Sequence, residues 1–353
     1  MEFSHAPENQ FTFADMTIST WGLINFESGS CLAWSPDNQF LAVTNKNTIW
    51  VYDVRNLSLP PVLLDGHTDV ISRIVFSPNS LILTSVSHDG TVRLWNSISR
   101  KLIVTLPISG YQLQSACFSA DGRFIVVGGA ENVLDYWSSG ILAVLDVYNE
   151  TSVARIETSR GISCVLFGPN GNEVIYAALD CQIYLWELGK QQEIMLFEDI
   201  PQEEGDQIIA MRISGDGSTL SSVSLRSKCI NRSLIDHTQH VLQLSNLYIR
   251  NADFAPRSNI IAYGNTPAWY PAETISEEDD VRYTNEGQLM VVQSEYTKTV
   301  CLWVWMSETS PIFLPGHRDD DIRAVAWSAD GQRLASADSS SIRLWHIKHK
   351  ILD

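Results

Sequence analysis

The side chains best suited to chemistry lie close together in the first third of the chain. Ser85, His67 and Asp89 are the residue types of a hydrolase triad, in which an imidazole held by a carboxylate takes a proton from a serine hydroxyl. His67 precedes Asp89 by 22 residues, and Trp95 follows that Asp by six. The same four side chains can instead form a chain of hydrogen bonds, because the indole N–H is a donor that a triad does not use.

The elements that carry these residues are short strands. Residues 64–96 contain two apolar runs, 70–76 and 81–86, separated by a Ser-Pro-Asn turn. Asp89-Gly90 then reverses the chain into a third run, 91–95, as Asp-Gly commonly does between paired strands. Three short antiparallel strands cannot bury both of their faces, so this unit needs similar neighbours.

This unit resembles the repeat of the WD-repeat (WD40-type) β-propeller family. In that family a Gly-His pair opens each unit of roughly 40 to 45 residues and a Trp-Asp pair closes it. The resemblance implies a buried chain of hydrogen bonds through Trp95, Ser85, His67 and Asp89. A satisfied buried network of this kind fixes one packing. The resemblance therefore favours a structural network over a triad, and no catalytic residue is predicted.

A turn of the Ser-Pro-Asp type recurs at intervals of about 42 residues, with one longer gap near the end. The seven turns begin at Ser35, Ser77, Ser119, Gly168, Ser214, Ala255 and Ser328. The residues before them are Trp34, Phe76, Phe118, Phe167, Ile213, Phe254 and Trp327. One bulky apolar side chain per repeat is typical of packing between stacked sheets. The prediction is an all-β fold, with residues 1–353 forming a single seven-bladed propeller of four-stranded antiparallel blades.

The outer strand of each repeat is expected at the start of the stretch that follows it. Six such strands are predicted, at residues 61–64, 101–106, 152–156, 193–197, 240–244 and 311–314. Residues 1–25 must then supply the seventh as an N-terminal tail and closing strand, at residues 17–23, paired with the strand that ends in Trp345. Such closure removes exposed sheet edges.

The network residues are expected to be complete in the second repeat alone. The seventh repeat keeps His317, Ser336 and Trp345, the fourth keeps Asp180 and Trp186, and the fifth matches worst.

Composition limits the class of partner. The chain of 353 residues carries 24 basic and 41 acidic side chains, for a net charge of −17, which opposes direct binding to nucleic-acid backbones. Neither a signal peptide nor a membrane-spanning run is present in the sequence, so a cytoplasmic protein without membrane insertion is expected. The six cysteines are far apart in the sequence, and no metal or cofactor is predicted.

Three segments exceed the repeat, at residues 131–140, 198–207 and 265–287. By resemblance to the family, all three open on the same face of the ring, where inserted loops carry binding functions. Four aromatic residues in them are candidate anchors for a partner: Tyr136, Trp137, Trp269 and Tyr270. The alternative is that these side chains fold back onto the stems of their own loops.

The same segments are rich in acidic residues. The densest run is Glu277, Glu278, Asp279 and Asp280. A field concentrated on one face speeds association with a basic partner, so a basic protein segment is predicted as the ligand of this face. A solvated acidic rim that only keeps the protein in solution is the alternative.

A second candidate surface is the mouth of the central channel. By resemblance to the family, the residue five positions before each turn lies there, which gives Ser30, Ser72, Gln114, Ser163, Ile209, Arg250 and Arg323. Arg250 and Arg323 could receive a carboxylate or a phosphate through paired hydrogen bonds. Neutralisation by acidic neighbours such as Asp321 is the alternative.

These observations favour a non-enzymatic scaffold or adaptor that binds a protein on the acidic inserted face. A sensor of small molecules or modified peptides at the channel mouth is the alternative. A hydrolase would need repeated acids on the inner strands, which offer instead a mixed set of Arg73, Arg212 and Asp253.

Overall fold

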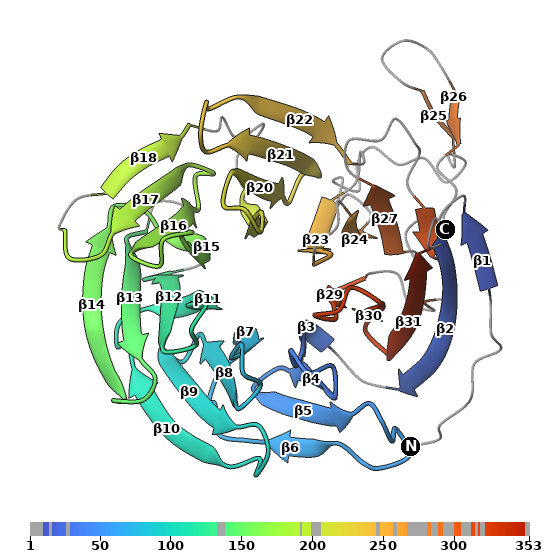
Figure 1. Cartoon of the computed structure of the whole chain (residues 1–353), viewed down its shortest axis with the longest axis horizontal. Helices are drawn as coiled ribbons and strands as arrows, with labels where there is room; N and C mark the ends of the chain where they lie inside the picture. Colours follow the sequence, from blue (N-terminus) through green and yellow to red (C-terminus); the bar gives the residue numbers. More distant parts are fainter. Residues whose placement is uncertain are drawn as a thin grey trace.

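The computed structural model describes most of the chain. The described residues are 10–13, 16–25, 29–132, 138–190, 193–198, 206–244, 248–256, 260–266, 281–283, 289–291, 300–304, 312–314, 317 and 322–349. Every regular element in these ranges is a β-strand, and the strands are arranged as sheets around a ring (Figure 1).

Within the described residues, six sheets have four strands, one has five, and a separate pair forms a hairpin. Blade one is β3 (Gly29–Trp34), β4 (Phe40–Asn45), β5 (Thr48–Asp53) and β6 (Val62–Leu64). Blade two is β7 (Ile71–Phe76), β8 (Ile82–Ser87), β9 (Thr91–Asn96) and β10 (Leu102–Pro107). Blade three is β11 (Gln112–Phe118), β12 (Phe124–Ala130), β13 (Gly140–Asp146) and β14 (Thr151–Thr158).

The remaining blades follow in chain order. Blade four is β15 (Ile162–Phe167), β16 (Glu173–Ala178), β17 (Ile183–Glu187) and β18 (Glu193–Phe197). Blade five is β19 (Ile208–Ile213), β20 (Thr219–Ser224), β21 (Lys228–Ser233) and β22 (Gln239–Gln243). Blade six is β23 (Tyr248–Phe254), β24 (Ile260–Thr266), β27 (Val300–Val304) and β28 (Ile312–Leu314).

The sheet that closes the ring joins the two ends of the chain. Its inner strands are β29 (Ala324–Trp327) and β30 (Arg333–Ala337), followed by β31 (Ser341–His349). β2 (Met16–Asn25) pairs antiparallel with β31 and sets Thr20 opposite Trp345. This is the pairing predicted for residues 17–23.

The sheet at the junction is larger than predicted. β1 (Gln10–Phe13) pairs with the outer side of β2, so this sheet has five strands. The prediction of an all-β propeller with four-stranded antiparallel blades is therefore confirmed for six blades, while the seventh sheet has one strand more. The segment that was expected to be only a tail before the closing strand supplies β1.

The core is divided among the contacts between neighbouring blades. Buried apolar residues of the described chain fall into seven clusters, and each cluster combines side chains from two adjacent blades. Each of the seven bulky residues that precede the recurring turns lies in or against a different cluster, as the sequence predicts. At the junction, Trp34 of blade one also donates its indole N–H to the carbonyl of Ala326 in β29, at 3.1 Å.

The recurring turn has its own local cause. In blade two, the Ser77 hydroxyl donates to Asn79 Oδ1 at 2.7 Å and accepts from the backbone N–H of Ile82 at 2.9 Å. The residue after the acid or amide has positive φ in six of these turns, at Asn38, Ser80, Gly122, Gly171, Gly217 and Gly331. A short side chain or Gly is therefore needed there.

The inserted segments begin and end at one face. Strands within each blade alternate in direction, so the connection from the second to the third strand emerges on the same side as the entry to the next blade. The segments after β12, β18 and β24 all leave the ring at such positions.

Three boundaries of these segments differ from the prediction. Gly140 already belongs to β13, and β24 continues through Asn265 to Thr266. The segment in blade six extends to residue 299 and contains a hairpin of β25 (Val281–Tyr283) and β26 (Leu289–Val291). The described residues include no helix of the length and apolar character needed to cross a bilayer.

Deletion of residues 1–25 tests the closure of the ring. Without β2, the outer edge of β31 loses its partner, so the truncated chain should melt at a lower temperature, less cooperatively, and aggregate through that edge. Thermal unfolding followed by circular dichroism, with light scattering, measures both effects. Deletion of residues 1–9 is the control because it keeps β1 and β2. Equal melting of the full and truncated chains would show that the ring does not need this strand.

Candidate functional site

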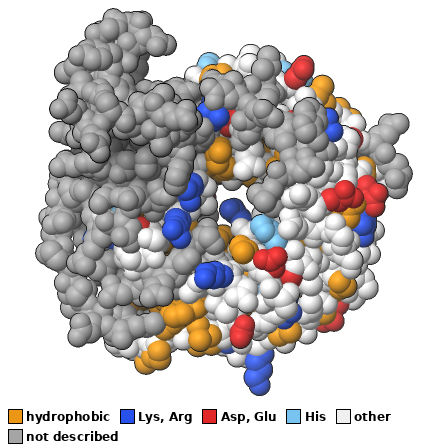
Figure 2. Space-filling model, turned by 180° about the vertical axis from the view of Figure 1, so that it is seen from behind, with side chains coloured by type: hydrophobic (Ala, Val, Ile, Leu, Met, Phe, Trp, Pro, Cys, Tyr) orange, Lys and Arg blue, Asp and Glu red, His pale blue; other side chains and the backbone are white. Residues whose placement is uncertain are grey.

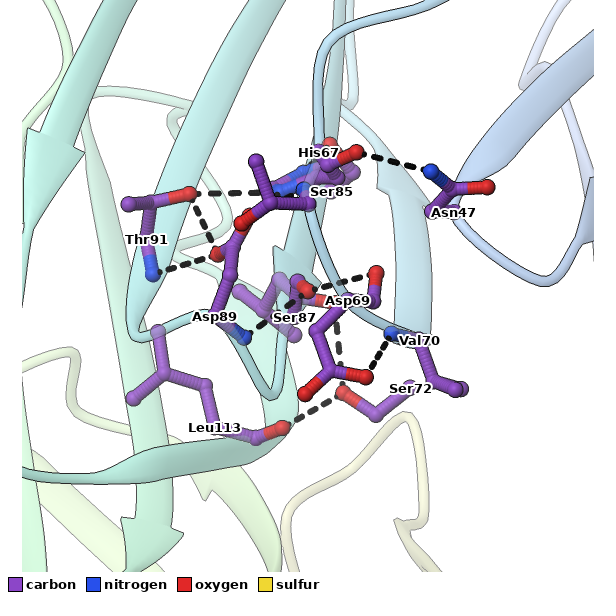
Figure 3. A network of polar contacts seen from close by, with 12 residues as sticks. Asn47, His67, Asp69, Val70, Ser72, Ser85, Ser87, Asp89, Thr91 and Leu113 are labelled. Atoms are coloured by element: carbon purple, nitrogen blue, oxygen red, sulfur yellow. Dashed lines mark hydrogen bonds and ion pairs between the residues drawn. The ribbon is translucent and has the colours of Figure 1, made fainter.

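The four residues of blade two form a chain of hydrogen bonds. The Trp95 indole N–H donates to Ser85 Oγ at 2.9 Å, and Ser85 Oγ lies 2.8 Å from His67 Nε2. His67 Nδ1 lies 2.8 Å from Asp89 Oδ2. Asp89 also accepts from the side chain of Thr91, so the network ties the third strand to the entry loop (Figure 3).

The indole N–H can only donate, and this fixes the direction of the whole chain of hydrogen bonds. Ser85 accepts from the indole and so donates its own hydrogen to His67 Nε2, which leaves Nδ1–H to donate to Asp89. Burial lowers the pKa of His67, against the raising effect of Asp89, so the imidazole is neutral. Ser85 is completely buried, and its hydroxyl oxygen already accepts from Trp95. A substrate therefore cannot reach this hydroxyl.

The sheet that closes the ring, formed by β29, β30, β31, β2 and β1 and called blade seven, contains a second complete network. This corrects the prediction that only blade two has one. His317 Nε2 lies 2.7 Å from Ser336 Oγ, which accepts from the Trp345 indole at 2.8 Å. His317 Nδ1 lies 2.8 Å from Asp338 Oδ2. Although burial opposes it, hydrogen bonds from His317 and from backbone amides lower the pKa of Asp338. Asp338 was not recognised in the sequence because it follows His317 by 21 residues, whereas Asp89 follows His67 by 22.

Blade five replaces the tryptophan with an arginine. Arg232 lies opposite Leu220, as Trp95 lies opposite Leu83 in blade two. The guanidinium donates to Ser222 Oγ at 2.7 Å, where Trp95 donates to Ser85. Arg232 is completely buried, with the Phe197 ring 5.3 Å from its central carbon. The poor match of this repeat is therefore a chemical substitution within the same architecture.

Blade four keeps the tryptophan without the network. Trp186 donates its indole N–H to the backbone carbonyl of Lys190 at 2.9 Å, within its own turn.

The ring encloses a cavity of about 880 Å³, lined by the inner strands of blades two to six together with single residues from the other two. On the face seen in Figure 2, several Lys and Arg side chains lie along one side of the central opening, and His and acidic side chains lie on its other side. The arginines that line the cavity are Arg73, Arg250 and Arg323.

Most residues expected at the channel mouth line this cavity. They are Ser72, Gln114, Ser163, Ile209, Arg250 and Arg323, while the side chain of Ser30 lies outside the described part. Ser72 donates to the Leu113 carbonyl at 2.6 Å (Figure 3), and Ser163 donates to the Ala177 carbonyl at 3.2 Å. Because both hydroxyl hydrogens are used by backbone carbonyls, these serines contribute to the wall, and the arginines carry the charge of the mouth.

Asp253 is the one acidic residue among those lining the described cavity. Its Oδ2 accepts from the Trp327 backbone N–H at 2.7 Å and its Oδ1 from Phe254 at 2.9 Å. Burial raises the pKa of Asp253, against the lowering effect of the Trp327 amide and of Arg73. Asp253 therefore covers the inner edge of β29. Of the mixed set predicted on the inner strands, Arg73 and Asp253 line the cavity with Arg250 and Arg323. Arg212 is not among the lining residues and donates to the backbone carbonyl of Ala255.

The predicted partner-binding residues lie outside the described part of the chain. These are Tyr136, Trp137, Trp269, Tyr270, Glu277, Glu278, Asp279 and Asp280. Of the acids at the edges of the same segments, Glu131 and Glu198 are exposed. Asp206 is buried, accepts from the Arg226 backbone N–H at 3.2 Å and does not add to the surface charge.

Comparison with known proteins agrees with the strand order and the networks. The family model described as WD domain, G-beta repeat matches residues 27–53, 60–96, 151–187 and 309–346. The chain carries WD40 repeats. The matched segments include both networks with a His, a Ser, an Asp and a Trp.

Three relatives show how widely the similarity extends. The transcriptional corepressor LEUNIG_HOMOLOG of Arabidopsis thaliana is 25% identical over 183 residues, which cover 51% of this chain and 22% of the corepressor. An uncharacterized WD repeat-containing protein of Synechocystis is 38% identical over 98 residues, 28% of each chain. Apoptotic protease-activating factor 1 of Rattus norvegicus is 22% identical over 348 residues, 77% of this chain and 26% of the relative. This WD40-repeat chain thus spans well under half of each.

His67→Ala tests the network of blade two. The substitution leaves the Ser85 hydroxyl hydrogen without its acceptor and removes one donor to Asp89, so the free energy of unfolding should fall by about 1 to 3 kcal/mol for each group that loses its bond. Urea unfolding measures this loss, and His240→Ala at an exposed position of β22 is the control. Equal stability of the two variants would mean that the network does not stabilise the blade.

The pH dependence of stability gives a second test. The folded chain holds the pKa of His67 below its unfolded value of about 6.5, so the unfolded chain binds the proton first as pH falls. The stability from this group is therefore present above pH ~6.5 and is lost below it, by up to about 1.4 kcal/mol per pH unit. The difference in unfolding free energy between the native chain and His67→Ala should narrow from pH 7.5 to 5. A constant difference would contradict the neutral state of His67.

Proposed function

We propose that this chain is a non-enzymatic protein-interaction platform that binds its partner on the face where the inserted segments emerge. One observation carries the proposal. The segments after β12, β18 and β24 interrupt different blades and yet leave the ring on the same side. Segments that exceed a repeat are free to specialise in binding, because the fold does not need them.

The relatives support a role that acts through other proteins. One is named as a transcriptional corepressor, and another is named for activating a protease. Since the chain spans only part of each, their names suggest a class of role and leave the partner of this chain to be found. The closed geometry of the Ser85, His67 and Asp89 set also supports a platform over a hydrolase.

The proposed partner presents a basic segment. The chain has a net charge of −17, and the inserted segment of blade six contains Glu277, Glu278, Asp279 and Asp280 in sequence. Exposed Glu131 and Glu198 lie at the edges of the other two segments. Like charge concentrated on one face attracts an opposite charge over a Debye length, which is roughly 8 Å at physiological salt. Trp269 and Tyr270 beside the acidic run are the proposed anchors.

Kinetics with the partner that co-purifies with the native chain test this surface. Reversal of Glu277 and Glu278 to Lys, and then of all four acids, should lower the association rate stepwise, by about tenfold or more at low salt. Trp269→Ala should instead raise the dissociation rate, because a buried anchor acts after contact. Surface plasmon resonance at several salt concentrations separates the two rates.

The control reverses Glu150, in the turn between β13 and β14, and Glu187, at the end of β17, because turns from the third to the fourth strand lie on the opposite face. This pair should leave both rates nearly unchanged. If the control slows association as much as Glu277 and Glu278 do, the effect belongs to net charge and the proposed face is wrong.

A further inference from the structure

We propose that the outer strand of blade two, β10, pairs with β10 of a second copy of this chain. The pairing joins two rings edge to edge into a dimer with two-fold symmetry. It uses the outer rim of the ring and none of the inserted segments. It therefore goes beyond the partner proposed above, and either proposal can fail without the other.

The outer strands of the ring differ in how their free edges are protected. Natural proteins protect such edges by short strands, by charged residues or by a covering segment. Here β6 and β28 have three residues each, β14 contains Arg155 and Glu157, and β18 begins with Glu193. β22 is mostly polar, and β1 covers the outer edge of β2.

β10 has less protection than the other outer strands. Its six residues, Leu102–Pro107, include no charged side chain, and Leu102 and Ile103 are exposed. Among the outer strands that the structure describes, it is the longest one without a charged residue. A bulge between Leu102 and Val104 and the missing N–H of Pro107 limit pairing near the two ends. The stretch between them is open to a further strand.

The pairing with β9 shows which backbone groups of β10 face outward. The Ile108 N–H donates to the Gly90 carbonyl at 2.7 Å, and Thr105 lies opposite Arg93 three positions earlier. In an antiparallel pair, residues that exchange hydrogen bonds alternate with residues whose N–H and C=O point away from the partner strand. Counted from Ile108, Thr105 belongs to the second class. Its N–H and C=O therefore point out of the edge of the sheet.

One blade of the ring already carries such an added strand. β1 pairs antiparallel with the outer side of β2, through four residue pairs from Gln10 opposite Ser19 to Phe13 opposite Met16. The outer edge of a blade therefore accepts a further antiparallel strand, and a few residues are enough to form it.

The occupant is a second copy because β10 complements itself. When two β10 strands run antiparallel about a two-fold axis at Thr105, the outward N–H and C=O of each Thr105 bond to those of the other. Ile103 of each copy then lies opposite Pro107 of the other, and no charged residue of the strand faces a like charge. Cross-strand pairs of threonines favour pairing. A patch that binds its own copy closes at two chains.

Exposed apolar side chains flank β10 on the same rim. Val62 and Leu63 on β6 and Val153 on β14 are exposed. β6, β10 and β14 follow one another around the outside of the ring (Figure 1). These side chains add apolar area beside the joined edges.

The dimer leaves both inserted faces free. β10 runs from the turn after the third strand of its blade toward the face where the inserted segments emerge. Since the two paired strands run in opposite directions, the inserted faces of the two copies point in opposite directions. One dimer can therefore hold two partners.

Analytical ultracentrifugation of the full chain over a range of concentrations tests the dimer. The native chain should show a reversible equilibrium between one and two copies. Added salt should strengthen the dimer, because each copy carries a net charge of −17 while the paired strands carry none. A single chain at every concentration and salt overturns the proposal, and so do assemblies larger than two copies.

Substitutions at Thr105 test the interface. Thr105→Lys sets two like charges opposite each other, and Thr105→Pro removes the outward N–H of each copy. Each should raise the dissociation constant of the dimer roughly tenfold to a hundredfold, since two hydrogen bonds or one close pair is lost. Thr151→Lys is the matched control at an exposed threonine of β14.

The lysine variants decide between edges. Thr105→Lys keeps the backbone of β10 intact, so it gives the decision if Thr105→Pro does not fold. Weakened dimers of Thr105→Lys, with unchanged dimers of Thr151→Lys, support the proposal. Equal dimerisation of the two lysine variants overturns it, because the contact then lies elsewhere.

Oxidation measures the register of the two strands directly. The Cα atoms of residues opposite each other in a hydrogen-bonded antiparallel pair lie about 5.5 Å apart, within the range of a disulfide. Thr105→Cys should therefore form a linked dimer under mild oxidation, seen on a non-reducing gel. The native chain and Thr151→Cys, which give the background of the six native cysteines, should not. No linked dimer of Thr105→Cys, or equal linking of Thr151→Cys, overturns the proposal.

Discussion

The structure depends on one constraint, which is that each small sheet has two faces to bury and must find a neighbour for each. The seven core clusters each lie between adjacent blades, so no blade is complete alone. A row of such sheets would end in two exposed faces. The pairing of β2 with β31, and the contact of Trp34 with Ala326, join the ends and remove them.

Closure also explains why the networks vary among blades. Blades two and seven hold a His, a Ser, an Asp and a Trp, while blade five keeps the serine and uses Arg232 in place of the tryptophan. Neighbouring sheets still supply the packing on both sides of blade five. An architecture held by seven such contacts tolerates the loss of a network in one blade, as Trp186 in blade four illustrates.

The sequence was sufficient for the fold because its signals are local. The Ser-Pro-Asp turns and the bulky residues before them predicted the strand order, and the predicted outer strand at residues 193–197 coincides with β18. Features that depend on distant partners were missed. β1 was not predicted because it exists only through β2, and Asp338 was missed because its turn is one residue shorter.

The sites were less predictable because the fold decides which charged side chains lie close together and which are buried. Arg250 and Arg323 were expected at the channel, but their place in one cavity with Arg73 depends on closure of the ring. Asp206 belongs to the predicted segment 198–207, yet it is buried and accepts from the Arg226 amide. Three arginines thus line the channel of a chain whose net charge is −17.

Native-state hydrogen exchange of the β2 amides tests the central claim of closure most directly. If β2 belongs to the ring, amides from Thr17 to Leu23 open only with global unfolding and exchange with the same free energy as those of β8 and β12. They should also share the dependence on denaturant shown by those strands. Exchange of β2 at much lower free energy, while β31 stays protected, would show that the ring holds together without this strand and would contradict the account.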